Sequence, residues 1–537
     1  MPLTQMLWLK VTRRPLISCL EDSYRFYPQL RLILSFCSFV AYEMISIVLG
    51  VAALLVAVYY WWANNASEGI HSDNFPPGPK GLPIVGDIFL FASKSRHTTI
   101  QQFGKQFGGV FSTRAGTAPR AVWVTSYKGF REALIDRAWG FAGRPEGVFF
   151  KDQSSVHHPG MIISGTEESA KNVRKFTLVT LRNLGFGQRS MQANILQEAE
   201  NVITEFRRKK SEPFNPRSIV ALATANVIAS ITLGRTFKYG DEGMVMMTET
   251  ITFGMKQILV AARDRMFPFM KYLPNNARTI MAEVFGSIKG FLNKIIDEHR
   301  PTHVPNEPRD FIDVWLDQST DVVTPTNSIY SSERLPNVLV DLFAGGFETT
   351  ATAFQWLFVM MLHHPEIQSK IHKELDRVVG LNAEVTLDHR DELVYTEAVI
   401  LETLRVYPLL PFAIPHQATD DTMLGGYLIP KGTTVMMHLY SILHDPELWD
   451  NVEEFKPDRF IKDGKISVPE YFVPFGAGRR SCIGEQLARK ELFLVFANIM
   501  SHFNLEKPAG AEVPSLETIQ AVVLQPKPFE IVAKPRQ

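Results

Sequence analysis

Cysteine is scarce in this chain. Its 537 residues include three cysteines, Cys19, Cys37 and Cys482, and two of these lie within the first forty residues. The rest of the chain therefore cannot hold an internal disulfide framework or a zinc site made of several thiolates. We infer that this larger part faces a reducing compartment.

An excess of positive charge is also absent. Lysine and arginine together number 56, as do aspartate and glutamate, so the formal net charge is zero. Nucleic-acid binding usually needs a basic surface, so a nucleic-acid partner is not expected. The sequence shows no internal repeats, and 45% of its residues are hydrophobic, which is enough for a large core.

One run of twenty residues carries no charge: "MISIVLGVAALLVAVYYWWA", residues 44–63. A helix of that length, rising about 1.5 Å per residue, spans a hydrocarbon core of about 30 Å. The tyrosines and tryptophans at its end are typical of an interfacial aromatic belt. A buried core helix and a cleaved signal peptide are the alternatives, but "WWANNAS" is a poor cleavage site. We therefore predict a transmembrane anchor over residues 44–63.

The orientation of this anchor depends on where the native chain begins. Five basic residues precede the run, whereas Lys80 is the first basic residue after it. Taken literally, the positive-inside rule places the following region outside the cytosol. If the native chain begins at Met44, residues 1–43 are an extension absent from the mature protein and the region faces the cytosol. The glycosylation sequon at Asn65 tests the topology: Asn65 is modified if it is lumenal and bare if it is cytosolic.

After a polar and proline-rich linker, residues 64–83, a folded region is expected over residues 84–537. Strand patterns occur in "VFSTRAG", "AVWVTS" and "TMLGGYLIPKGTTVMMH", while helical patterns dominate in between, to about residue 410. The expected class is mainly α with a smaller β region.

The segment "SSERLPNVLVDLFAGGFETTATAFQWLFVMMLHHP" predicts one long helix that is apolar on nearly every face and therefore runs through the interior. Ser331 or Ser332 is the expected N-cap, with Pro336 in the first turn and Pro365 as the terminator. Two glycines in its middle, Gly345 and Gly346, cost about 1 kcal/mol each relative to alanine.

These glycines have two interpretations. They allow either a ligand or a second helix to approach the backbone closely. The threonine hydroxyls that follow can bond to helix carbonyls or to a ligand.

The cysteine in the larger part of the chain lies in "FGAGRRSCIGEQLA", residues 475–488. Neither nucleotide-binding loop pattern fits, because Ser481 stands where a third glycine is needed and the P-loop lysine is missing. What remains is one cysteine in a tight loop, beside arginines and a helix start. This setting predicts a lowered pKa for Cys482 and metal ligation. A single thiolate ligand with arginines for carboxylate groups is what a haem requires.

Two further stretches carry paired charges. Glu402 and Arg405 in "ETLR" lie one helical turn apart, and Arg459 lies between aromatic residues in "FKPDRF". They are either ordinary surface charges or members of one buried guanidinium–carboxylate network.

Taken together, "FGAGRRSCIG", "GGFETT", "ETLR" and "FKPDRF" resemble the cytochrome P-450 family of haem-thiolate monooxygenases, over roughly residues 76–537. The stretches "FPPGPKGLPIVGD", "FTLVTLRNLGFG" and "DFIDVWL" are similar to the animal microsomal group. The resemblance implies the cytochrome P-450 fold and haem b (iron protoporphyrin IX) as cofactor.

The resemblance also implies roles for individual residues. Cys482 is the axial ligand of the haem iron and Phe475 shields its sulfur, while Thr349 and Glu348 deliver protons to dioxygen. The residues expected to hold the haem propionates are Arg144, Arg174, His416 and Arg480. The family often has a tryptophan at the position of Ala170, so one propionate hydrogen bond is expected to be missing.

The implied substrate is a lipophilic small molecule: a steroid, terpenoid, fatty acid or xenobiotic. The positions that match substrate-facing walls are Phe149, Phe150, Phe412, Ala413 and Ile414. Phe253 and residues 266–270 match an access channel near the membrane.

The implied activity is hydroxylation or epoxidation that depends on NADPH and O2. Electrons come from an NADPH-dependent flavoprotein reductase, which binds the basic residues Arg174, Lys175, Arg182, Arg479 and Lys490. The implied location is the endoplasmic reticulum membrane, single-pass, with the catalytic domain in the cytosol and in contact with membrane lipid. The alternatives are a reductase-independent haem-thiolate isomerase or dehydratase and a non-catalytic haem sensor. Retention of Glu348 and Thr349 argues against both.

Overall fold

The computed structural model describes residues 43–59, 74–81, 95–116, 118–145, 168–186, 188–266, 277–319, 330–519 and 521–537, with five isolated positions (40, 86, 87, 90 and 93). The chain divides into two compact units, residues 1–73 and residues 74–537.

In the first unit, residues 43–59 are helical, and residues 43–58 are exposed. None of the helices described is both long enough and apolar enough to cross a membrane. The anchor over residues 44–63 therefore stays a prediction. Its last four residues, the extension before residue 40, Asn65 and the linker up to residue 73 lie outside the described residues.

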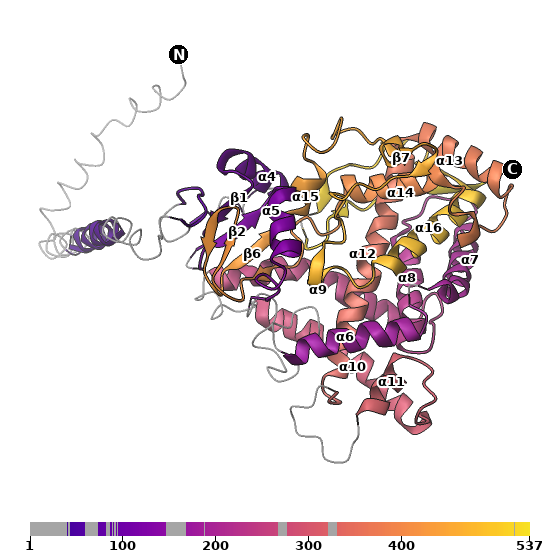
Figure 1. Cartoon of the computed structure of the whole chain (residues 1–537), viewed down its shortest axis with the longest axis horizontal. Helices are drawn as coiled ribbons and strands as arrows, with labels where there is room; N and C mark the ends of the chain where they lie inside the picture. The colour runs from indigo at the N-terminus through magenta and orange to yellow at the C-terminus, as the bar shows by residue number, and fades with distance from the viewer. Residues whose placement is uncertain are drawn as a thin grey trace, which may run out of the picture. The chain divides into compact units, whose positions relative to one another are not determined.

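A four-stranded sheet lies at one side of the second unit (Figure 1). Its order is β1 (Val110–Thr113), β2 (Ala121–Val124), β6 (Thr434–Met437) and β3 (His416–Gln417). The strands β2 and β6 are parallel, and the other pairs are antiparallel. The strand patterns in "VFSTRAG" and "AVWVTS" are therefore confirmed. Residues 74–81 belong to this unit, because Ser112 of β1 donates from its backbone N–H to Pro77 O at 2.7 Å and from Oγ to Pro76 O at 2.8 Å.

Four two-stranded ladders complete the β structure of the described part of the chain. They are β4 (Thr422–Leu424) with β5 (Tyr427–Ile429), β7 (Ile461–Lys462) with β8 (Lys465–Ile466), β9 (Phe503–Glu506) with β12 (Val532–Pro535), and β10 (Thr518–Ile519) with β11 (Gln525–Pro526).

Helices make up most of the unit, as the sequence predicts. The α-helices before the long helix are α4 (Arg96–Phe107), α5 (Tyr127–Arg131), α6 (Glu168–Asn183), α7 (Gln192–Arg208), α8 (Arg217–Thr232), α9 (Glu242–Met266), α10 (Ala277–His299) and α11 (Phe311–Gln318). Those from the long helix onward are α12 (Leu335–His363), α13 (Pro365–Val378), α14 (Val394–Val406), α15 (Leu439–Leu443) and α16 (Glu485–His502).

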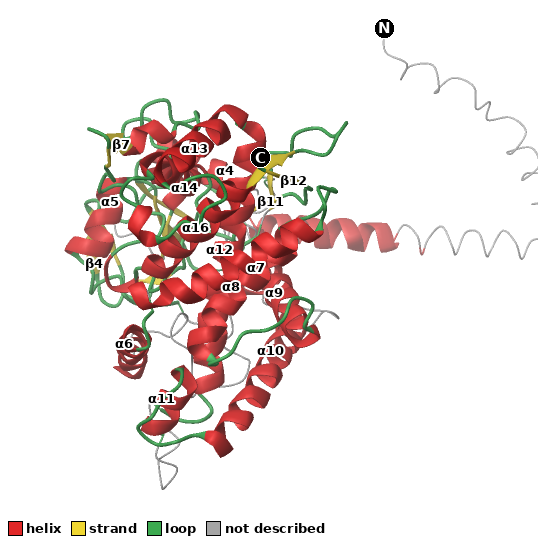
Figure 2. Cartoon of the chain, turned by 90° about the vertical axis from the view of Figure 1, so that its right-hand side faces the viewer, coloured by secondary structure: helices red, strands yellow, loops and turns green. Residues whose placement is uncertain are grey.

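The long apolar helix α12 runs through the interior, where it packs against α8, α10 and α16 (Figure 2). Its N-cap is Arg334, so the expected cap at Ser331 or Ser332 is wrong, because a turn over residues 332–334 precedes the helix. Pro336 lies in the first turn, where its missing N–H costs nothing. Pro365 follows the end of α12 and is the first residue of α13.

Candidate active site

The loop that carries Cys482 is folded tightly against the short π-helix Glu132–Asp136. Gly478 has a φ of 67°, and a Cβ at this position would lie 1.9 Å from the carbonyl oxygen of Leu134. The backbone N–H of Cys482 donates to the carbonyl oxygen of Phe475 at 3.0 Å and closes the loop. Only glycine fits this close approach with a left-handed backbone.

The Cys482 sulfur lies at the N-terminus of α16 and accepts hydrogen bonds from the backbone N–H groups of Gly484 and Glu485. Burial raises its pKa, and this effect outweighs the lowering by these N–H groups and by Arg174. The expectation of a lowered pKa is therefore wrong, because removal of water disfavours the thiolate more than these neighbours stabilise it. The Cys482 side chain nevertheless keeps exposed surface, so a metal cation can reach the sulfur. The positive charge of such a cation would stabilise the thiolate form.

Three arginines from distant segments gather near this loop. Arg174 of α6 donates to Ser481 O at 2.5 Å, and Arg480 Nε donates to Ala142 O at 3.0 Å. Arg144 donates to Pro415 O at 2.8 Å. Burial lowers the pKa of Arg144 well below its ordinary value, and the charges of Arg480 and Arg174 lower it further. Arg144 is buried and the other two arginines are partly buried. Such a concentration of positive charge suits a ligand with two carboxylates.

His416 lies on strand β3 beside these arginines. Its Nδ1 donates to the carbonyl oxygen of Phe141 at 2.7 Å, since a carbonyl can only accept. Burial, followed by the charge of Arg144, lowers the pKa of His416 to about 3, so the imidazole is neutral. In this neutral state Nε2 can only accept a hydrogen bond. It would donate to a haem propionate only if the propionate carboxylate stabilised the protonated form of the His416 ring. This role of His416 stays a prediction.

Helix α12 is buried along most of its length, but a strip in its middle is accessible: Ala344, Gly345, Gly346 and Thr349. Gly345 is exposed, and the Thr349 hydroxyl donates to its carbonyl oxygen at 2.7 Å. Gly346 instead faces α8, because a Cβ there would lie 3.3 Å from Ile228 Cγ1. The approach of a second helix is therefore confirmed for Gly346, while the approach of a ligand to Gly345 stays a prediction.

Glu348 has no exposed surface. Its carboxylate accepts hydrogen bonds from Arg217 at 2.8 and 3.1 Å, from Thr252 Oγ1 at 2.7 Å and from Gln525 Nε2 at 2.6 Å. Sequence reasoning missed these three residues, which come from α8, α9 and β11. Arg217 alone left a signal, since it is the one charged residue in the sequence of the otherwise uncharged helix α8.

The expected substrate-facing residues are only partly described, because Phe149 and Phe150 lie outside the described residues. The ring of Phe412 packs edge-on against Trp123, with centroids 5.8 Å apart, and stacks on His438 at 5.3 Å. Ala413 and Ile414 are half-buried, and Ala413 has a left-handed φ of 49°. The role of all five residues stays a prediction.

The remaining expected residues are Phe475, Ala170 and those of the access channel. The Phe475 ring lies beside the Arg489 guanidinium, 5.2 Å from its central carbon, and its shielding of the sulfur stays a prediction. The side chain of Ala170 and residues 267–270 of the expected channel are outside the described residues, while Phe253 is exposed on α9.

The charged residues of "ETLR" and "FKPDRF" form one buried network, as the second interpretation predicts. Arg405 donates to both oxygens of Glu402, at 2.7 and 2.9 Å, and Arg459 donates to the same carboxylate at 3.0 Å. The remaining donors of the two arginines bond to backbone carbonyls, including Leu443 O and Asp450 O. This network connects α14, which carries Glu402 and Arg405, to the "FKPDRF" segment, and both precede the cysteine loop in the chain.

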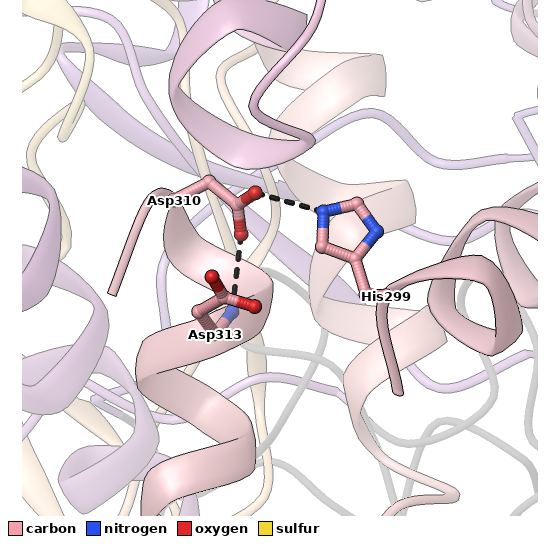
Figure 3. Close-up of side chains that lie close together, drawn as sticks. All are labelled: His299, Asp310 and Asp313. Atoms are coloured by element: carbon pink, nitrogen blue, oxygen red, sulfur yellow. Dashed lines mark hydrogen bonds and ion pairs between the residues drawn. The ribbon is translucent and has the colours of Figure 1, made fainter. Parts of the chain in front are cut away.

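A second polar cluster lies at the C-terminus of α10. Figure 3 shows His299 and Asp310 facing each other, with Asp313 on the first turn of α11. His299 bonds through Nδ1 to Ile295 O at 2.9 Å and through Nε2 to Asp310 at 2.8 Å, while Asp310 accepts from the Asp313 N–H at 3.0 Å. These atoms have the spacing of metal ligands. Both imidazole nitrogens face oxygen acceptors, so the cluster forms a hydrogen-bonded joint between α10 and α11.

The donor set around Cys482 fits haem b. The Cys482 sulfur is reachable, and α12 offers an accessible strip. Three arginines offer positive charge for two propionates: Arg144 is buried, and Arg174 and Arg480 are partly buried. The cytochrome P-450 family model matches residues 76–533.

The chain is also similar to individual proteins of that name. It is 34% identical to cytochrome P-450 2J2 of Homo sapiens over 86% of this chain and 92% of that protein. It is 33% identical to cytochrome P-450 2J3 of Rattus norvegicus, over 90% and 96% of the two chains, and 34% identical to cytochrome P-450 2C29 of Mus musculus, over 88% and 95%. The chain therefore belongs to the cytochrome P-450 family, as its cysteine loop predicts.

Proposed function

We propose that this chain is a membrane-bound haem-thiolate monooxygenase in which Cys482 is the axial ligand of haem b. It inserts one atom of O2 into a lipophilic small molecule, by hydroxylation or epoxidation, and reduces the other to water with electrons from NADPH. The observation that carries the proposal is the reachable Cys482 sulfur at the N-terminus of α16, beside the buried Arg144 and the partly buried Arg174 and Arg480. When bound, haem b supplies the activation of dioxygen.

The chain's own residues would hold and shield this cofactor. The N–H groups of Gly484 and Glu485 orient the sulfur, and Arg144, Arg174 and Arg480 pair with the two propionates. The accessible strip of α12 would leave space for dioxygen, and the Thr349 hydroxyl lies on this strip. Glu348 and Thr349 would carry the protons that the reaction consumes.

The electron donor is proposed to be an NADPH-dependent flavoprotein reductase that binds next to the cysteine loop. Lys175, Arg182 and Arg479 are exposed there. Arg479 stacks on the exposed ring of Trp139, with its central carbon 3.1 Å from the ring centroid. This cationic face, three residues from Cys482, suits an acidic partner.

The location is proposed to be the endoplasmic reticulum membrane, with the catalytic domain in the cytosol. The uncharged run over residues 44–63 supports a single-pass anchor. Expression in microsomes tests this topology. If the catalytic domain faces the cytosol, added protease digests it and Asn65 stays unmodified. A glycan on Asn65 would place the catalytic domain on the lumenal side and contradict the proposal.

The function is tested first with the carbon monoxide difference spectrum of the purified protein, reduced either by NADPH with a microsomal reductase or by dithionite. A red-shifted thiolate band with both reductants is expected, and lipophilic substrates are then screened for oxygenated products. A band with dithionite alone would favour the reductase-independent isomerase or the sensor. No band with either would overturn haem-thiolate ligation.

A further inference from the structure

A run of four basic residues marks the end of helix α7. Its last two residues are Arg207 and Arg208, and two lysines follow in a turn over residues 209–211. The third residue of this turn is Ser211, so Arg208 stands three positions before a serine hydroxyl. Protein kinases with an acidic substrate groove select this pattern, because the groove pairs with the guanidinium.

The pattern alone does not identify a site. In the described part of the chain, two other hydroxyl residues also have an arginine three positions before them: Thr99 after Arg96 and Thr177 after Arg174. Thr177 is fully buried within α6, and Thr99 lies within α4, where it donates to Ser95 O at 3.1 Å. Phosphoryl transfer needs the hydroxyl in line with the γ-phosphate of ATP, so both helices would have to unfold first.

Ser211 lies in a different setting. It follows the end of α7 and is partly exposed, while Lys210 and Glu212 on either side are exposed. Its hydroxyl donates to Ala533 O at 3.4 Å, which is long for a hydrogen bond between two oxygen atoms. The hydroxyl is therefore weakly held, and a kinase can take it without opening the core.

The backbone of the turn is strained. Lys210 and Ser211 have left-handed φ values of 51° and 61°, although neither is glycine. A residue with a Cβ disfavours this conformation. The turn is closed by hydrogen bonds from the Lys210 N–H to Arg207 O at 3.0 Å and from the Glu212 N–H to Lys209 O at 2.8 Å. Because an extended conformation relieves the strain, this turn opens more readily than a regular segment.

Arg208 is available to a kinase. It forms an ion pair with Glu205, but 68% of its side-chain surface is exposed. Exposed ion pairs contribute little to stability, so a kinase carboxylate can replace Glu205. Arg207 is similar, since it pairs with Glu200 at 3.5 Å and is 51% exposed, but it stands four positions before Ser211. The two arginines differ mainly in their spacing from the serine.

We propose that Ser211 is a phosphorylation site for a protein kinase that recognises an arginine three positions before its acceptor. The Ser211 oxygen attacks the γ-phosphorus of ATP, the bond from that phosphorus to the β–γ bridging oxygen breaks, ADP leaves, and the hydroxyl proton passes to solvent. The new phosphate is negatively charged and repels Ala533 O, and it pairs with the basic run in the exposed turn. This inference goes beyond the proposed oxygenation chemistry and rests on the proposed cytosolic location alone.

The carbonyl that Ser211 releases belongs to β12, the last strand of the chain. Ala533 is paired with Leu505 of β9. Two residues earlier, Ile531 exchanges two backbone hydrogen bonds with Phe214, at 2.9 and 3.0 Å, and Phe214 lies three residues after Ser211. Phosphorylation therefore loosens the contact between the turn and β12. The N–H groups of Phe214 and Ile531 should exchange with deuterium about two- to tenfold faster.

The test uses the full-length protein, ATP and the catalytic subunit of cAMP-dependent protein kinase, which selects arginine at this spacing. Mass spectrometry measures phosphate per protein and locates the modified residue. We expect phosphate on Ser211 and none on Thr99 or Thr177. Ser211→Ala should abolish the modification, and Arg208→Gln should slow it about tenfold. The matched control Arg207→Gln should stay within about twofold of the parent.

Three results would overturn parts of this proposal. If Ser211 carries no phosphate, or if Thr177 is modified instead, the turn is not the site. Equal rates in Arg208→Gln and Arg207→Gln would overturn recognition through Arg208. Unchanged deuterium exchange at Phe214 in the fully phosphorylated protein would overturn the loosening of β12.

A second experiment separates this inference from the proposed location. The kinase and ATP are added to microsomes that contain the protein, with and without detergent. Phosphate on Ser211 in intact microsomes supports both the site and a cytosolic catalytic domain. Phosphate that requires detergent would contradict the location and support the site, whereas none in either sample would overturn the site.

Discussion

The guanidinium of Arg405 donates two hydrogen bonds to the carboxylate of Glu402, at 2.7 and 2.9 Å, and neither side chain has any exposed surface. Arg459 Nε also donates to this carboxylate, to Oε1 at 3.0 Å. One negative charge is thus shared by two positive charges in a dry environment, while backbone carbonyls satisfy the remaining donors of both arginines.

Arg405→Met is expected to destabilise the protein by about 3–5 kcal/mol, because it breaks a buried pair and leaves polar groups uncompensated. The control is Arg131→Met, which removes an exposed pair with Glu470 at 3.6 Å and should cost about 1 kcal/mol or less. Urea unfolding followed by circular dichroism measures both. Equal effects for the two variants would contradict the structural role of the network.

Cys482→Ala is expected to abolish both the thiolate spectrum and turnover, because no other cysteine lies after residue 40. The control is Ser481→Ala, since the contact that Ser481 makes with Arg174 uses its backbone oxygen. The carbon monoxide difference spectrum reports the outcome. An unchanged spectrum in Cys482→Ala would refute the ligand assignment.

Two glycines of the cysteine loop provide a matched pair. Gly476 and Gly478 have φ values of 69° and 67°, but a Cβ on Gly476 would meet nothing within 4 Å, whereas one on Gly478 would strike Leu134 O. Gly476→Ala should cost about 1–2 kcal/mol from backbone strain alone. Gly478→Ala should displace the loop and cause most of the haem to be lost, measured as haem per protein. Equal haem content in the two variants would show that the approach to Leu134 is unimportant.

The joint between α10 and α11 makes stability depend on pH. The hydrogen bond to Asp310 raises the pKa of His299 above its ordinary value, against the lowering by burial. A raised pKa means that the contribution is fully present below about pH 6.5, the usual value for an unfolded chain, and is lost as pH rises through the folded value. Hydrogen bonds to charged groups contribute about 1.5–3 kcal/mol.

Thermal unfolding of the parent protein and of His299→Gln, measured across this pH range, tests the joint. The variant should be less stable below pH 6.5, and the difference should shrink as pH rises. His303→Gln is the control, because His303 forms a similar contact with Asp317 at 2.9 Å. A difference that grows with pH would have the wrong sign and contradict a protonated His299.

Trp139→Ala should weaken reductase binding about two- to fivefold, because an exposed cation–π contact is worth about 0.5–1 kcal/mol and orients Arg479. The half-saturating reductase concentration measures this effect, while the dithionite-reduced spectrum should not change. Lys462→Ala, on β7, serves as the control. If both variants need the same amount of reductase, Trp139 does not contribute to docking.

Local patterns in the sequence predicted several elements of the fold. The tight glycine loop at Cys482, the strands β1 and β2 and the extent of α12 were predictable because turn residues and hydrophobic periodicity act within a few residues. The N-cap of α12 was not, because two serines and an arginine compete within four positions and tertiary contacts decide between them.

By itself, the sequence determined the family and the single candidate thiolate, whereas the structure decided that Glu402, Arg405 and Arg459 form a buried network and are not surface charges. Only the tertiary structure decided that Arg217 and Gln525, 131 and 177 positions from Glu348, bind the same carboxylate. It also decided that Gly345 is open while Gly346 meets Ile228, and that burial raises the pKa of Cys482. The physical reason is the same in each case: desolvation and contact depend on which distant elements pack together, and no local pattern encodes that.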